Sequence, residues 1–92
     1  MELKFNTDNN LIYIGNNENE KEAYVSFSIV DNSLLTIRHI YVDSKFRGQG
    51  ISSKLLITLV NYAQENNFKI RSMCGYSSSW LAKHEEYSHL LA

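Results

Sequence analysis

The first half of the chain alternates apolar and polar residues, as strands with one buried face do. Such alternation occupies residues 3–5 and, over a longer run, residues 23–30; the apolar run 11–14 between them reads as a second strand, entered from a polar turn. Asp31-Asn32 has the composition of a tight turn, so we expect a hairpin into a fourth strand over residues 35–42. Strict alternation along that strand places four residues on one face: Leu35, Ile37, His39 and Tyr41.

The second half of the chain changes to helical periodicity. Apolar residues recur every three or four positions over residues 51–63, which predicts a helix whose apolar stripe covers a sheet face. Asn66-Asn67 suits a helix end, since Asn tolerates left-handed backbone. Residues 68–73 alternate again as a fifth strand, and residues 77–92 read as helical with a break near His84-Glu85.

The expected order is therefore β-β-β-β-α-β-α. Strands joined by a helical crossover run parallel, so the fourth and fifth strands should be the only parallel pair in a mixed, mostly antiparallel sheet. This is an α+β fold class. Its 92 residues suit one domain over 1–92, near the lower end of the size range that folds alone.

A glycine-spaced turn, Arg47-Gly48-Gln49-Gly50-Ile51, joins the fourth strand to the first helix. Such a junction leaves backbone N–H groups unpaired at the helix start, and with the helix dipole they form an anion site suited to phosphate. Gly48 and Gly50 allow close approach, because a side chain there would hold a phosphate away from the backbone. Lys45, Arg47 and Lys54 add positive charge around the turn.

Composition narrows the function classes. The chain is 43% hydrophobic and 21% charged, which is ordinary for a globular protein. A net charge of −1 gives no case for nucleic acid or an anionic membrane, and no apolar run approaches the roughly 20 residues that span a bilayer. The start of the chain lacks a secretory signal pattern, so we expect a cytoplasmic protein whose single cysteine stays reduced.

Two common phosphate-binding motifs do not fit this glycine turn. A Walker loop needs Gly-Lys-Ser/Thr after four intervening residues, and that sequence is missing. A dinucleotide-binding fold carries its glycines after the first strand of a repeating βαβ pattern, whereas here they follow the fourth strand and only one crossover is expected.

Three motifs taken in order resemble the GNAT N-acetyltransferase superfamily. Tyr41-Val42 followed by residues 45–51 is similar to its acetyl-CoA signature. More closely, the chain is similar to a short GNAT-like subfamily in its motifs His39-Ile40-Tyr41-Val42, Cys74-Gly75-Tyr76 and His84-Glu85-Glu86-Tyr87. The chain departs from that pattern at Lys45, where the superfamily favours Gln or Arg, at Ile40 in place of Thr, and at Glu85 in place of Pro.

The resemblance implies a minimal GNAT-like fold that uses acetyl-CoA. In such folds the fourth and fifth strands splay apart and hold the pantetheine arm between them, here against the backbone of Ile40, Tyr41 and Val42. The pyrophosphate then rests on the N–H groups of the turn, supplied by Arg47, Gly48, Gln49, Gly50, Ile51 and Ser52. The thioester lies near the end of the fifth strand, beside Cys74, and the acetyl group passes to an amine acceptor that the sequence does not identify.

The catalytic candidates are Cys74, His39 and Tyr76, and two mechanisms use them. In the first, the amine attacks the thioester directly and a group such as Tyr76 protonates the departing CoA thiolate. In the second, Cys74 takes the acetyl group before passing it on, which requires a lowered thiol pKa from a helix start or from His39.

Other interpretations compete with these. Cys74 also suits a buried inert thiol, His39 a structural histidine, and Tyr76 simple packing. The domain could bind acetyl-CoA as a non-catalytic carrier or sensor. A zinc site of Cys74, His84 and His89 lacks paired cysteines and a fourth ligand, so we expect no metal. For assembly we expect a monomer or a weak dimer.

Overall fold

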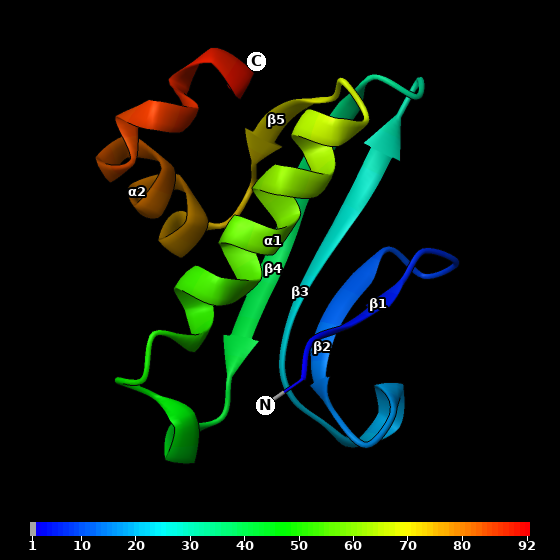
Figure 1. Ribbon diagram of the computed structural model, residues 1–92, viewed down its shortest axis with the longest axis vertical. Helices are drawn as coiled ribbons and strands as arrows, with labels where there is room; N and C mark the ends of the chain where they lie inside the picture. The colour runs from blue at the N-terminus through cyan, green and yellow to red at the C-terminus, as the bar shows by residue number, and fades with distance from the viewer. Residues whose placement is uncertain (1) are drawn as a thin grey trace.

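One five-stranded sheet organises the fold, with its strands in the order in which they follow along the chain (Figure 1). The computed structural model describes residues 2–92. The first three pairings are antiparallel and only β4 and β5 are parallel, as predicted. The strands are β1 (Lys4–Asn6), β2 (Leu11–Gly15), β3 (Lys21–Val30), β4 (Leu34–Val42) and β5 (Lys69–Ser72).

The β3–β4 hairpin forms at the predicted turn. Asp31 and Asn32 both have φ of 53°, and the Ser33 N–H donates to the Val30 carbonyl at 3.0 Å. Two successive left-handed residues define the turn type whose twist matches that of paired strands, and Asp and Asn adopt this backbone more readily than most residues. The turn chemistry therefore sets the pairing of the two longest strands.

Helix α1 (Ile51–Glu65) crosses the sheet face between β4 and β5, two residues longer than predicted (Figure 1). Its stripe of Leu55, Leu56, Leu59 and Val60 is fully buried against the inner residues of the sheet. The helix ends at the predicted asparagine pair: Asn67 has φ of 60°, and the Phe68 N–H returns to the Ala63 carbonyl at 2.8 Å. This left-handed end turns the chain directly into β5.

The C-terminal helical segment begins earlier than predicted. Helix α2 spans Gly75–Lys83, with Cys74 at its N-cap. The predicted break falls at His84, after which η3 (Glu85–Leu90) continues as a 3-10 helix. Two further short 3-10 helices are η1 (Glu18–Glu20) and η2 (Ser44–Phe46). The Ala92 N–H donates to the Ile70 carbonyl at 2.9 Å, so the end of the chain lies beside β5.

A β-bulge corrects the face assigned to the second half of β4. Ser26 pairs with His39 but Phe27 pairs with Ile37, so Arg38 is an extra residue in the ladder. One extra residue shifts the alternation, so each residue of β4 after Arg38 points to the opposite face from the one that strict alternation predicts. Leu35 and Ile37 are in the core, but His39 and Tyr41 are exposed, and Ile40 packs toward the core instead. The prediction that His39 and Tyr41 share the Leu35 face was wrong.

The core supports one stability prediction. Leu59 is completely buried at the centre of the α1 stripe, while Ile57 on the same helix is 39% exposed. Leu59→Ala should lower the free energy of unfolding by about 2–5 kcal/mol, because it removes buried methyl groups and leaves a cavity. Ile57→Ala, the matched control, should change it by less than about 1 kcal/mol. Urea unfolding of both variants measures the difference, and equal losses would contradict this packing.

Candidate functional site

The site begins where β4 continues past the end of β5. The two strands pair only from Leu34–Lys69 to Ile37–Ser72, and the Met73 N–H closes the pairing on the Ile37 carbonyl at 2.8 Å. Beyond this point β4 runs on to Val42 while the chain after β5 turns into α2 (Figure 1). The last part of β4 therefore has β3 on one side and no strand on the other.

The backbone of that part of β4 offers unpaired polar groups. The Asp43 N–H donates to the Glu22 carbonyl of the neighbouring chain segment at 2.8 Å. The backbone N–H and C=O of Tyr41, two residues earlier, therefore also point toward β3. Because successive residues of an antiparallel strand direct their polar groups to opposite edges, Ile40 and Val42 direct theirs away from β3. The Arg47 Nε donates to the Val42 carbonyl at 3.1 Å, so part of this edge is already capped.

The glycine turn presents open amides to the same region. Gly48 and Gly50 have φ of 81° and 75°, and a Cβ built on either would meet no atom within 4 Å. Helix α1 starts without a side-chain cap, and its first helical bond runs from the Lys54 N–H to the Gly50 carbonyl at 3.1 Å. The amides of the first helical turn are thus free of helical partners, as the anion-site prediction requires, but the predicted Arg47 N–H is already bonded to the Ser44 carbonyl at 3.3 Å.

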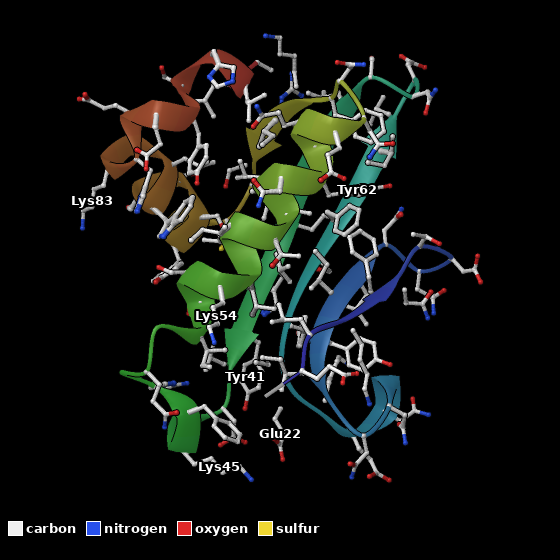
Figure 2. All side chains as sticks on the ribbon, viewed as in Figure 1. Glu22, Tyr41, Lys45, Lys54, Tyr62 and Lys83 are labelled. Atoms are coloured by element: carbon white, nitrogen blue, oxygen red, sulfur yellow. The ribbon has the colours of Figure 1, made fainter. Side chains whose placement is uncertain are left out.

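The basic side chains around this turn differ in how they are engaged. Lys45 forms an ion pair with Glu22 at 3.5 Å, and both are well exposed. Lys54 is exposed on the first turns of α1, and Figure 2 shows Lys45, Tyr41 and Lys54 at the end of the molecule where α1 begins. Arg47 is held by its bond to β4. The positive charge is therefore local, in a chain whose net charge is −1.

A cavity of about 440 Å³ joins these features. Among the predicted cofactor residues Gln49 does not line it: its side chain donates to the Lys45 carbonyl at 3.4 Å. Phe46 and Ser53 line the cavity and were not predicted; they flank the glycine motif and carried no distinguishing pattern. The lining consists of Ile40, Tyr41, Val42, Phe46, Arg47, Gly48, Gly50, Ile51, Ser52, Ser53 and Tyr76.

Cys74 lies half-buried at the start of α2, next to Ile40 of β4. Burial raises the pKa of its thiol, but the Ser77 N–H, the Ser77 hydroxyl and the N–H groups of Tyr76 and Ile40 lower it, and the pKa falls below its ordinary value. The Ser77 hydroxyl acts on the thiol without a formed hydrogen bond, because it has no partner among the described residues, and Cys74 makes no side-chain capping bond. The lowered pKa gives this thiol a larger thiolate fraction than an ordinary cysteine has at the same pH.

The other two catalytic candidates fall in different places. Tyr76 is 52% exposed on the first turn of α2 and lines the cavity. His39 is not among the lining residues; its ring lies on the outer sheet face, 5.7 Å between centroids from Tyr24, which is also 5.7 Å from Tyr41. Of the three candidates only Tyr76 lines the cavity. Cys74 lies two residues earlier at the N-cap of α2 and is not among the lining residues, and His39 is directed to a neighbouring surface.

The histidines near the C-terminus contact aromatic and backbone groups. The His84 ring stacks on Trp80 at 3.9 Å, and its Nδ1 is 2.7 Å from the Trp80 carbonyl. The His89 carbonyl accepts from the Lys69 Nζ at 2.7 Å. Within residues 2–92, no group of three or more His, Cys, Asp or Glu side chains is placed to hold a metal, and no helix is long and apolar enough to cross a membrane.

Comparison with solved structures gives relatives at different degrees of similarity. A GCN5-like protein from Staphylococcus aureus is 35% identical, with a TM-score of 0.82 over 99% of this chain and 87% of its own. A GNAT family acetyltransferase from Elizabethkingia anophelis with acetyl-CoA bound is 24% identical, with a TM-score of 0.59 over 84% of this chain and 51% of its own.

A third neighbour, Ard1 from Thermoplasma volcanium, is 16% identical, with a TM-score of 0.62 over 88% of this chain and 55% of its own. The chain thus spans about half the length of these two larger proteins, whose likeness concerns the fold.

No curated protein sequence is similar enough to count as a relative. The family of GCN5-related N-acetyl-transferases matches the chain over residues 11–90, which include all but the first strand and the last residues. Together with the strand separation and the glycine turn, this match shows that the chain belongs to the GCN5-related N-acetyltransferase family, the GNAT family, whose members use acetyl-CoA.

Proposed function

We propose that this protein binds acetyl-CoA in the cavity between β4 and α1 and transfers the acetyl group to an amine. The observation that carries the proposal is the meeting of an unpaired strand edge with an open helix start at one cavity. An elongated ligand with a phosphate at one end and amides along its arm matches those two features. The acceptor amine is not specified by them.

The phosphates of the ligand occupy the glycine turn in this proposal. The amides of Gly48, Gln49, Gly50, Ile51 and Ser52 supply donors, and Gly48 and Gly50 leave the space above the backbone open. Arg47 at the cavity wall adds charge. The likeness to an acetyltransferase fold that binds acetyl-CoA supports the choice of ligand.

The pantetheine arm follows the open edge of β4. The polar groups of Ile40 and Val42 point away from β3, and Tyr41 contributes to the cavity wall between them. Amides of the arm can pair with this edge as a neighbouring strand would. Its length then takes the thioester from the glycine turn toward Ile40, where Cys74 lies.

Two side chains carry the chemistry in this proposal. The Tyr76 hydroxyl protonates the CoA thiolate as the amine displaces it, and Cys74 lies near the thioester as a thiol of lowered pKa that can accept the acetyl group. His39 faces the outer surface beside Tyr24, where it can contact an acceptor rather than the thioester. In this proposal the protein acts in the cytosol, as a single domain and as a monomer or weak dimer.

The phosphate site is tested by a charge change that keeps the backbone. Gly50→Asp should reduce acetyl-CoA affinity below detection in calorimetry, because a carboxylate would stand beside the phosphates. Gly50→Asn is the matched control: it has the same shape and tolerates left-handed backbone but carries no charge. It should keep more of the affinity. Unchanged binding by a folded Gly50→Asp protein would disprove the site.

Turnover is tested with amines and free-thiol detection. Tyr76→Phe should lower the rate of CoA release with amine about a hundredfold while binding acetyl-CoA as the native protein does, since general acid catalysis contributes about that factor or more. If the native protein binds acetyl-CoA but releases no CoA with any amine screened, it acts as a carrier or sensor instead.

Cys74 is tested by its reactivity against pH. Because the thiolate is the reactive form and the pKa of Cys74 is lowered, alkylation should reach half its maximal rate at a lower pH than for a free cysteine. Bound acetyl-CoA should slow the reaction. Mass spectrometry after incubation with acetyl-CoA should show one added acetyl group, absent in Cys74→Ala, if the thiol is a nucleophile. Slow labelling that ignores acetyl-CoA would remove Cys74 from the site.

A further inference from the structure

Ser53 is the cavity residue that connects the start of α1 to the C-terminal segment. It is the third residue of α1, half-buried, and its hydroxyl oxygen accepts a hydrogen bond from the Trp80 Nε1 at 2.9 Å. Trp80 belongs to α2 and is only 5% exposed. The bond therefore joins two helices at the cavity wall.

The chemistry of this bond determines what the Ser53 hydroxyl has left to offer. Indole N–H is only a donor, so the serine oxygen must be the acceptor, and the serine keeps its own O–H for another partner. Within helices, hydroxyls usually donate to the carbonyl four residues earlier, as Thr58 does to Lys54 at 2.8 Å. For Ser53 that position is Gln49, which precedes the helix, and the Ser53 hydroxyl donates no hydrogen bond to the described residues.

Trp80 is itself held by a stack of rings. The His84 ring lies at 3.9 Å and 19° on one side, and the Tyr87 ring is 5.8 Å from the indole at 13°. Since the Trp80 carbonyl can only accept, the His84 Nδ1 carries the proton in their 2.7 Å bond. His84 and Tyr87, the first and last residues of the motif at 84–87, thus pack on the indole that donates to Ser53.

We propose that Ser53 binds the pyrophosphate of the acyl-CoA through its free O–H, and that Trp80, held by His84 and Tyr87, is the positioning residue that keeps this O–H directed at the ligand. The inference rests on the proposed function, because it assigns a further residue to the same cavity. A hydroxyl beside the open amides of α1 adds an uncharged side-chain donor to a phosphate site proposed from main-chain amides and Arg47.

Calorimetry with CoA, dephospho-CoA and S-acetylpantetheine tests the assignment. Ser53→Ala should weaken CoA and dephospho-CoA binding about tenfold each, the loss expected of one hydrogen bond to a charged group. S-acetylpantetheine lacks the pyrophosphate and should bind Ser53→Ala as it binds the native protein. Ser53→Thr keeps the hydroxyl and should retain most of the affinity. Thr58→Ala, which removes a hydroxyl from the same helix outside the cavity, should bind CoA normally.

The positioning role of Trp80 is tested by a double-mutant cycle. Trp80→Phe keeps an aromatic ring but removes the N–H, and it should weaken CoA binding by less than Ser53→Ala does. The double variant should bind no more weakly than Ser53→Ala, because both changes act through one hydroxyl. Additive losses would show that Trp80 acts independently of Ser53. The only tryptophan of the chain is Trp80, so its fluorescence should change on CoA binding, and this change should disappear in Ser53→Ala.

The outcomes separate this inference from the proposed function. If the native protein binds neither acetyl-CoA nor CoA, the proposed function fails and Ser53 has no ligand to hold. If the native protein binds CoA and Gly50→Asp does not, but folded Ser53→Ala binds CoA with native affinity, then only the role of Ser53 is overturned. A loss confined to CoA and absent with dephospho-CoA would overturn the pyrophosphate assignment.

Discussion

The separation of β4 from β5 is the constraint on which the rest of the site depends. A strand edge without a neighbour must find other partners for its N–H and C=O groups, because buried polar groups without partners are costly. In β4, two of these backbone groups have partners. The Val42 carbonyl accepts from Arg47, and the Ile40 N–H lies near the Cys74 sulfur. The remaining groups line a cavity of about 440 Å³, so the separation that leaves part of β4 without a neighbouring strand also creates the cavity.

The bulge at Arg38 determines which side chains of β4 face the core beside the cavity and which face outward. Without it, His39 and Tyr41 would point into the core and Ile40 would point outward; with it, Ile40 and Val42 pack inward and a ring cluster of Tyr24, His39 and Tyr41 forms on the outer face. A bulge is a property of two paired strands, set by where each finds its partner. The alternation of one strand alone contains no sign of it, which is why the sequence predicted the strand correctly and its outer face wrongly.

Features set by neighbouring residues were predictable, and features set by distant contacts were not. Four predicted features each depend on a few adjacent residues, and the structure has all of them: helix α1, its left-handed end at Asn67, the Asp31-Asn32 turn and the open glycine turn. The partnership of Ser53 and Trp80 joins residues 27 positions apart and depends on how α2 docks on α1. Gln49 lies in the glycine turn, but its side chain donates to the Lys45 carbonyl and does not line the cavity.

Two helices begin beside the open end of β4, and each N-terminus suits a different anionic group of the proposed ligand. The α1 start has free amides and the Gly48 and Gly50 backbone, which fit a phosphate. The α2 start directs the N–H groups of Tyr76 and Ser77 toward the Cys74 sulfur, which fits a thiolate, whether of this cysteine or of the CoA that departs in the reaction. The bond between Trp80 and Ser53 ties these two helices together. In the proposed site, the distance between the phosphate end and the sulfur end is therefore set by the packing of α2 on α1, so a change in how α2 docks would alter both ends at once.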